Sequence, residues 1–236
     1  MKALIIGKNG QVACELMQTV PKGIEATSFG REDIDILNFE ALEAKIIAFK
    51  PSVLINASAY TAVDKAETEQ QQAYAINRDA VKNMALICKN NNIRLLHIST
   101  DFVFDGTKNT AYTIDDKTNP VSVYGASKLA GEDEIRTHHS FNSAIVRTSW
   151  VYSSHGNNFV KTMLRLMKEK EKLSVVADQI GCPTYARGLA EFLWNLAQAP
   201  KVEPLYNWSD LGVASWYDFA VAIQEEGFKL GLLDKK

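Results

Sequence analysis

Residues 3–13 read "ALIIGKNGQVA" and join a short apolar run to a segment with helical spacing. The run at 3–6 is typical of a buried strand, and the apolar residues from Gln11 onward recur as they do in an amphipathic helix. Gly7 and Gly10 allow a sharp turn and a close approach of the backbone to a ligand. The first N–H groups of the helix and its positive end then favour a pyrophosphate. An ordinary strand–helix turn is the alternative, because the spacing is GxxGxxA and not GxGxxG.

Beyond this junction, strands and helices alternate along the chain. We expect strands at 24–29, 52–58, 93–100, 143–149 and 173–177, and helices at 11–20, 39–49, 64–91, 120–137, 157–171, 184–198 and 215–228. Strands separated by helices pair in parallel through right-handed crossovers. The pattern predicts an α/β fold with a doubly wound, Rossmann-like parallel sheet. In such sheets ligands bind at the carboxyl ends of the strands.

The composition is that of an ordinary globular protein. The 236 residues are 46% hydrophobic and 23% charged, with a formal net charge of −2. No basic stripe indicates nucleic acid, and no apolar run approaches the ~18 residues that span a bilayer. Three dispersed cysteines and four histidines form no ligand pattern, so we expect no metal site and a reduced, cytoplasmic setting. We expect His97, inside an apolar strand, to be a core histidine.

The segment "TSFGRED" at 27–33 bears on the choice of cofactor. After the second strand, an acidic residue binds the ribose hydroxyls of NAD, whereas an arginine accommodates the 2′-phosphate of NADP. Ser28 and Arg31 favour NADPH, and Glu32 and Asp33 keep NADH open. We expect Asp35 and Ile36, after a further short strand, to lie near the adenine.

Small and hydroxyl residues follow the next two strands. Ala57, Ser58 and Ala59 would let the chain pass close to a cofactor, although a tight strand–helix junction explains them equally well. Ser99 or Thr100 would stand at the carboxyl edge of the sheet, where a hydroxyl can bind a substrate oxygen. The alternative role of these hydroxyls is to cap a helix or turn.

Residues 124–128 read "YGASK", and Tyr124 and Lys128 lie one helical turn apart. A nearby ammonium group lowers the pKa of a tyrosine, which prepares it to give a proton to a carbonyl oxygen. A packed tyrosine beside a solvated lysine would be the interpretation of this segment taken alone.

The order of a phosphate loop, a Ser/Thr strand end and a Tyr–Lys helix resembles the extended short-chain dehydrogenase/reductase superfamily. The strings "GKNGQV", "TAVDKAE", "STDFVFDG", "YGASKLAGE", "RTSWVY", "GNNFVKTML" and "DQIGCPT" narrow the resemblance to the dTDP-4-dehydrorhamnose reductase family, from residue 1 to about 225.

The resemblance implies hydride transfer from NADPH (or NADH) to C4 of dTDP-4-dehydro-L-rhamnose, with Tyr124, Lys128 and Thr100 as the catalytic residues. It places the dTDP-sugar at Thr100, Asp101 and Trp150. Together with the residue patterns, it gives the cofactor-binding set Gly7, Gly10, Gln11, Val12, Arg31, Asp35, Ile36, Ala57, Ala59, Tyr60, Thr61, Tyr124 and Lys128. The NAD(P)-binding domain would be 1–150, and 151–236 would supply the substrate lobe.

The chain departs from the family pattern in three ways. It is some tens of residues shorter, so we expect the C-terminal substrate lobe to be incomplete. Phe102 stands where the family often has Tyr. A Mg²⁺-bridged homodimer is not expected, because Arg187 replaces one ligand and only Glu15 is retained.

Two alternative functions stay open at this point. One is an NADP-binding regulatory protein with little catalytic activity, because the family resembles the regulatory β subunit of methionine adenosyltransferase. The other is a sugar-nucleotide epimerase of the same fold, which would retain NAD and give no net reduction.

Overall fold

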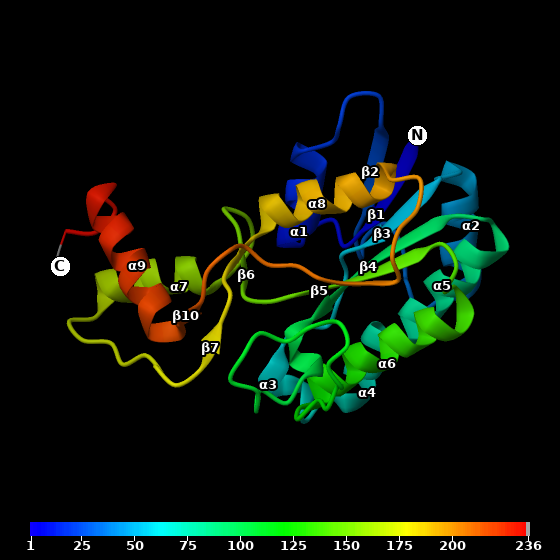
Figure 1. The fold of residues 1–236 in the computed structure, drawn as a ribbon. Helices are drawn as coiled ribbons and strands as arrows, with labels where there is room; N and C mark the ends of the chain where they lie inside the picture. The colour runs from blue at the N-terminus through cyan, green and yellow to red at the C-terminus, as the bar shows by residue number, and fades with distance from the viewer. Residues whose placement is uncertain (235–236) are drawn as a thin grey trace.

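The computed structural model describes residues 1–234 and is built on a six-stranded sheet (Figure 1). The strand order is β2-β1-β3-β4-β5-β9, and every neighbouring pair is parallel. The strands are β1 (Lys2–Ile6), β2 (Glu25–Phe29), β3 (Val53–Asn56), β4 (Arg94–Thr100), β5 (Ser143–Thr148) and β9 (Leu205–Asn207). The doubly wound α/β fold predicted from the sequence is confirmed.

Helices cover both faces of the sheet (Figure 1). Ala3 and Ile5 of β1 face a core that includes α1 (Gln11–Gln18) and α8 (Ala186–Gln198). Leu4 and Ile6 face the opposite core, with residues from α2 (Phe39–Phe49), α5 (Ala80–Asn90) and α6 (Val123–His138). A strand that is buried on both faces needs a continuous apolar run, which explains "ALII".

The direction of winding reverses between β1 and β3. From β1 the chain moves to β2 on one side, and it then returns to place β3 on the other side of β1. The loops that follow β1 and β3 therefore lie at this reversal point, at the carboxyl edge of the sheet, which is the usual ligand position in this fold.

The helix expected at 64–91 is divided into α3 (Val63–Ala66), α4 (Gln70–Tyr74), a π-helical segment η1 (Ala75–Asp79) and α5. The π turn contains Asn77, which is buried and forms two hydrogen bonds to the backbone of the loop after β3. Asn77 Oδ1 accepts from the Tyr60 backbone N–H at 2.9 Å, and Nδ2 donates to the Tyr60 carbonyl at 3.1 Å. Nδ2 also donates to Ser127 Oγ on α6 at 3.0 Å.

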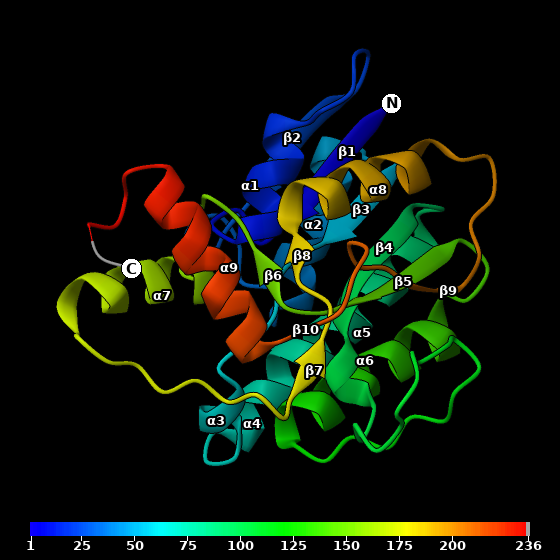
Figure 2. The ribbon, with the colours of Figure 1, turned by 60° about the vertical axis from the view of Figure 1, so that its left-hand side comes forward.

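Several segments after β5 form a second unit beside the sheet (Figure 2). It contains α7 (Phe159–Glu169) and α9 (Trp216–Lys229), which pack around Met163, Ala220 and Ile223. Its short strand pairs are β7 (Ile180–Gly181) with β10 (Ala214–Ser215) and β6 (Val151–Tyr152) with β8 (Thr184–Tyr185).

Two local expectations are wrong. Residues 173–177 form no strand, and the Val176 carbonyl in this irregular segment accepts from Tyr217 N. No further strand separates β2 from Asp35 and Ile36 either, because residues 30–38 consist of turns and irregular chain. The boundary expected at residue 150 stays a prediction. Downstream of it, α8 and β9 return to the main sheet and its core. No helix within residues 1–234 combines the length and apolar character that a membrane span requires.

Two glycines let α6 approach its neighbours closely. A Cβ on Gly125 would collide with the Phe102 carbonyl oxygen, in the 3-10 turn η2 (Asp101–Val103). A Cβ on Gly131 would collide with the carbonyl oxygen of Asn77 in η1. Both neighbours are backbone atoms, which cannot rotate away. The position of the helix that carries Tyr124 and Lys128 therefore depends on these two glycines.

We predict that Gly131→Ala destabilises the protein, although alanine is the better helix former. Overpacking against backbone costs about 1–3 kcal/mol of the free energy of unfolding, measured by urea denaturation. Thr137→Ala, at an exposed position of the same helix, should leave that free energy unchanged or slightly higher. A Gly131→Ala protein as stable as the wild type would contradict this account of α6.

Candidate active site

The loop after β1 has the geometry of a phosphate-binding turn. Gly7 adopts a φ of +111°, and a Cβ there would lie 2.7 Å from the carbonyl oxygen of Ala57. Gly10 closes the turn by donating its N–H to the Gly7 carbonyl at 2.7 Å. As the residue before α1, Gly10 offers no side chain to cap the helix, and the first N–H groups of α1 are left for a ligand. The turn thus fits a dinucleotide.

The residues after β2 separate into paired and unpaired charges. Lys8 forms ion pairs with Glu32 at 3.3 Å and Asp33 at 3.2 Å, and Asp33 also accepts the Gly30 N–H at 2.9 Å. The bond from Gly30 and the Lys8 charge hold the pKa of Asp33 below its usual value. Arg31 is exposed and has no ion-pair partner within residues 1–234. Arg31 is therefore available at this edge for an anionic ligand group.

The residues expected near the adenine and those in the loop after β3 differ in their burial and contacts. Asp35 is exposed and accepts the Leu37 N–H at 3.0 Å, while Ile36 packs against the core beside β2. The chain at Ala57 borders Gly7, and Ala59 and Thr61 continue the same loop. The Tyr60 side chain is buried and donates to Glu69 Oε2 at 2.6 Å. This bond, followed by burial, raises the pKa of Tyr60 to about 12.

Tyr124 lies at the start of α6, next to the end of β4. Burial raises its pKa to about 12, a side-chain hydrogen bond with Thr100 acts in the opposite direction, and the charge of Asp101 raises it further. The Phe102 ring meets the Tyr124 ring edge-on, with centroids 5.5 Å apart. Thr100 also donates to Asp101 Oδ1 at 3.1 Å, and burial raises the pKa of Asp101 to about 6. A protonated phenol is thus held at the strand edge by a neighbouring hydroxyl.

Lys128 is buried one turn further along α6, with 2% of its surface exposed. Its Nζ donates to the Ile98 carbonyl at 2.7 Å and lies 3.4 Å from His97 Nε2. Burial lowers the pKa of Lys128 to about 8, against the charge of Glu132. The expectation that Lys128 lowers the pKa of Tyr124 is wrong for this structure, because burial dominates that pKa and the lysine amine bonds to β4 instead.

Trp150 follows β5 at the same edge, with a φ of +48°. Its ring stacks on Trp216 of α9 at a centroid distance of 3.5 Å and an angle of 7°. Gly181 contacts the indole closely, since a Cβ there would lie 2.5 Å from Trp150 Cε2. Phe159 and Phe219 complete the cluster around Trp216. The Trp150 indole, which we expect to contact the sugar, therefore also contacts the second unit.

Four polar residues of this region were not predicted as functional: Asn56, Asn77, His97 and Glu132. All four are buried and hydrogen-bonded to residues distant in sequence. Glu132 accepts a two-point contact from Arg147 at 2.9 and 2.7 Å, and a bond from Ser99 at 2.6 Å. Only a strand register or a helix contact brings such partners together, so no local pattern reveals them.

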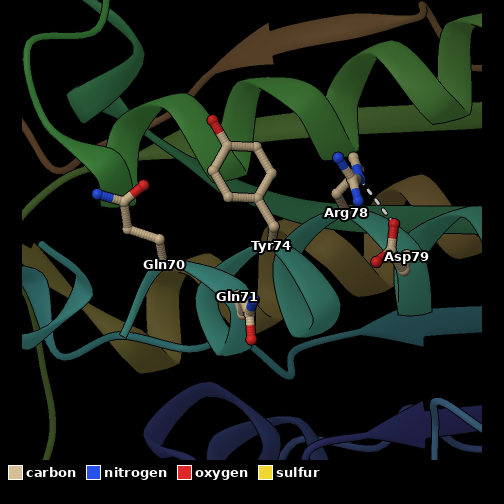
Figure 3. A pocket seen from close by; sticks show the side chains of 5 residues that line it. All are labelled: Gln70, Gln71, Tyr74, Arg78 and Asp79. Atoms are coloured by element: carbon tan, nitrogen blue, oxygen red, sulfur yellow. Dashed lines mark hydrogen bonds and ion pairs between the residues drawn. The ribbon is translucent and has the colours of Figure 1, made fainter. Parts of the chain in front are cut away.

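Two surface cavities lie away from this edge. One, of about 410 Å³, is formed by α4 and η1 and is lined by Gln70, Gln71, Tyr74, Arg78 and Asp79 (Figure 3). Arg78 donates to Asp79 at 2.6 Å and lies 5.2 Å from the Tyr74 ring. The other, of about 430 Å³, lies between α7 and α9. Neither cavity contains a residue of the predicted catalytic set.

Comparison with known proteins identifies the family of this chain. The family model described as "RmlD substrate binding domain" matches residues 1–229. The dTDP-4-dehydrorhamnose reductase of Aggregatibacter actinomycetemcomitans is 42% identical over 240 residues, covering 99% of this chain and 81% of that protein. The crystal structure of the dTDP-4-dehydrorhamnose reductase of Bacillus anthracis in complex with NADP superposes with a TM-score of 0.93 at 38% identity. That match covers 96% of this chain and 80% of the other.

A more distant structure shows how far the fold alone extends. The UDP-glucose 4-epimerase of Thermus thermophilus, in complex with NAD, has a TM-score of 0.82 at only 16% identity. Fold similarity at that level does not identify a reaction. Identity near 40% along almost the whole chain does establish the family. The chain belongs to the RmlD family, among the dTDP-4-dehydrorhamnose reductases.

Proposed function

We propose that this protein reduces the C4 keto group of dTDP-4-dehydro-L-rhamnose to dTDP-L-rhamnose with NADPH, or with NADH. The observation that carries the proposal is the position of Tyr124, at the start of α6, beside Thr100 at the end of β4, on the same sheet edge as the Gly7 turn. A phenolic proton, a second hydroxyl and a pyrophosphate-binding turn are the groups that such a reduction needs. Two relatives at 40% and 42% identity are named dTDP-4-dehydrorhamnose reductase.

The cofactor would be held by the first three strand ends. The backbone of Gly7, Gly10, Gln11 and Val12 would bind the pyrophosphate, and Arg31 the 2′-phosphate of NADP. Asp35 and Ile36 would border the adenine. The middle part of the cofactor would lie along Ala57, Ala59, Tyr60 and Thr61. Because the Tyr60 side chain is committed to Glu69, we assign it a backbone contact. When bound, the reduced nicotinamide supplies a hydride.

Tyr124 acts as the proton donor in this proposal. Its raised pKa keeps the phenol protonated at neutral pH, so a proton is available to the substrate oxygen. Thr100 binds the same oxygen and orients it. Lys128 is one helical turn away and restores the Tyr124 proton after turnover. The charge that develops on the oxygen is thereby neutralised inside a partly buried site.

The sugar nucleotide would be bound by Thr100, Asp101 and Trp150, with the second unit beside them. We assign cofactor binding to residues 1–150 and substrate contacts to segments within 151–236, together with the end of β4. The stacking of Trp150 on Trp216 supports this assignment, because it connects the end of β5 to α9. A cytoplasmic location is proposed from the family, as is a homodimer without a bridging metal.

Tyr124→Phe should lower kcat by about 10²–10⁴-fold with little change in NADPH affinity, because only the transferred proton is removed. The assay follows NADPH oxidation with dTDP-4-dehydro-L-rhamnose, and calorimetry follows cofactor binding. Tyr74→Phe, at a half-buried position of α4 outside the predicted site, is the matched control and should retain full activity. Wild-type and Tyr124→Phe proteins that bind NADPH but are equally inactive would instead indicate a regulatory protein.

The pH profile should show an alkaline limb that belongs to Lys128. Its pKa of about 8 means that the amine carries its proton below this pH and loses it above. Tyr124, with a pKa of about 12, stays protonated across the range. We therefore expect kcat/KM to be constant below pH 7 and to fall tenfold per pH unit well above pH 8. A flat profile up to pH 10 would contradict this assignment.

Arg31→Ala should weaken NADPH binding by roughly 10- to 100-fold, the value of a lost charge-assisted hydrogen bond. NADH lacks the 2′-phosphate, so its dissociation constant should remain unchanged. Arg165→Ala, which removes an exposed arginine on α7, serves as the control for net charge. Equal losses for the two cofactors would show that Arg31 does not bind the 2′-phosphate.

A further inference from the structure

A line of buried polar groups connects β3, β4 and α6 beneath the active-site edge. Asn56 and His97 are direct neighbours in the register of β3 and β4, and both are at most 1% exposed. Asn56 Nδ2 lies 3.0 Å from His97 Nδ1. On the other side of the ring, His97 Nε2 lies 3.4 Å from Lys128 Nζ. The imidazole is therefore between an amide and the lysine that the proposed reaction uses.

Ser58 fixes the direction of hydrogen bonding along this line. Asn56 Oδ1 accepts from the Ser58 backbone N–H at 3.0 Å and from Ser58 Oγ at 2.7 Å. A backbone N–H can only donate, so the oxygen of the Asn56 amide must face Ser58. The amide nitrogen consequently faces His97. Rotating the amide by 180° would leave the Ser58 N–H opposite another donor.

This orientation determines the tautomer of His97. The Asn56 NH₂ group donates, and Nδ1 must accept. Burial, followed by the charge of Lys128, keeps the pKa of His97 well below its usual value, so the ring is neutral. A neutral ring that accepts at Nδ1 carries its proton on Nε2. That N–H points at the lysine nitrogen, and the 3.4 Å separation is longer than an ordinary hydrogen bond.

We infer that His97 is a positioning residue for Lys128: its imposed Nε2–H disfavours a proton on the lysine amine and holds that amine against the Ile98 carbonyl. A neutral amine has a lone pair that can accept from Nε2–H, whereas an ammonium group can only oppose it. The neutral amine still donates an N–H to the Ile98 carbonyl, and the ammonium form gives up its third proton near neutral pH. The inference rests on the proposed function only in taking Lys128 as part of the reductase site.

The charged groups around Lys128 also affect its pKa, independently of His97. Within residues 1–234, the carboxylate that raises the pKa of Lys128 is Glu132, one turn along α6. Glu132 is itself paired with Arg147 of β5 and Arg136 of α6. Asp101 and Tyr124 lie towards the open edge, and β3 contributes the uncharged Asn56. The test must therefore change the tautomer of His97 without changing the Glu132 ion pairs.

In Asn56→Asp the new side chain has nearly the same shape as asparagine, but the hydrogen bond between residue 56 and His97 changes direction. A carboxylate can accept from Ser58 and also from His97 Nδ1–H, which leaves Nε2 free to accept from a Lys128 ammonium. We expect the titration midpoint of Lys128, measured by NMR of ¹³C-lysine-labelled protein, to rise by about one pH unit or more. The Lys128 signal is assigned from its loss in Lys128→Arg. The measurement needs neither cofactor nor turnover.

Two further variants separate the imidazole from the added charge. His97→Asn keeps an acceptor for Asn56 but removes Nε2–H, and should also raise the midpoint. In this background, adding Asn56→Asp should raise it by less than Asn56→Asp does alone. An unchanged midpoint in both single variants, or equal effects of Asn56→Asp in the two backgrounds, would overturn the inference. A wild-type midpoint near ~10.4, the ordinary lysine value, would do the same.

Activity gives an independent second measurement. If the protein turns over, the alkaline limb of kcat/KM should move to higher pH in Asn56→Asp by the same amount as the NMR midpoint. An inactive wild-type protein with a shifted midpoint would refute the proposed function and leave the role of His97 intact. An active protein whose midpoint does not respond to the variants would refute the role of His97 alone.

Discussion

The close contact between the end of β1 and the end of β3 is the constraint on which the site depends. Gly7 turns with a positive φ directly against the Ala57 carbonyl, where no Cβ fits. The order of the strands reverses between β1 and β3, and this reversal point is where the fold usually binds ligands. The same turn starts α1 without a side-chain cap, which leaves the first N–H groups of the helix for a ligand. Fold and binding site thus share one local geometry.

The catalytic residues are placed by polar groups buried behind that edge. Gly131 and Asn77 hold α6 against η1, and Glu132 joins the same helix to Arg147 of β5. Burial of an unpaired polar group is costly, so these partners define one position for α6. Lys128 is buried in the same layer, which explains its low pKa. The chemistry of the lysine is therefore determined mainly by the interior and less by the open site.

The sequence alone predicted the parallel sheet and most helices, because apolar runs and helical periodicity are local signals. It also placed Thr100 at the carboxyl edge of the sheet, which follows from parallel pairing, whereas the joint role of Thr100 and Tyr124 came from the family resemblance. It did not predict the π turn at Asn77 or the three-residue β9, whose partners lie far away in the chain. The predicted direction of the pKa shift of Tyr124 was wrong. Burial, which depends on the tertiary structure, raises this pKa more than a lysine at i+4 could lower it.

The central claim is that this edge transfers a hydride to the C4 carbon of a dTDP-4-keto sugar while Tyr124 protonates the oxygen. The most direct measurement uses NADPH deuterated at the transferred position, with dTDP-4-dehydro-L-rhamnose, and NMR of the product. The account predicts one equivalent of cofactor oxidised and dTDP-L-rhamnose with deuterium at C4. A bound but unoxidised cofactor, or an epimerised sugar without deuterium, would contradict it.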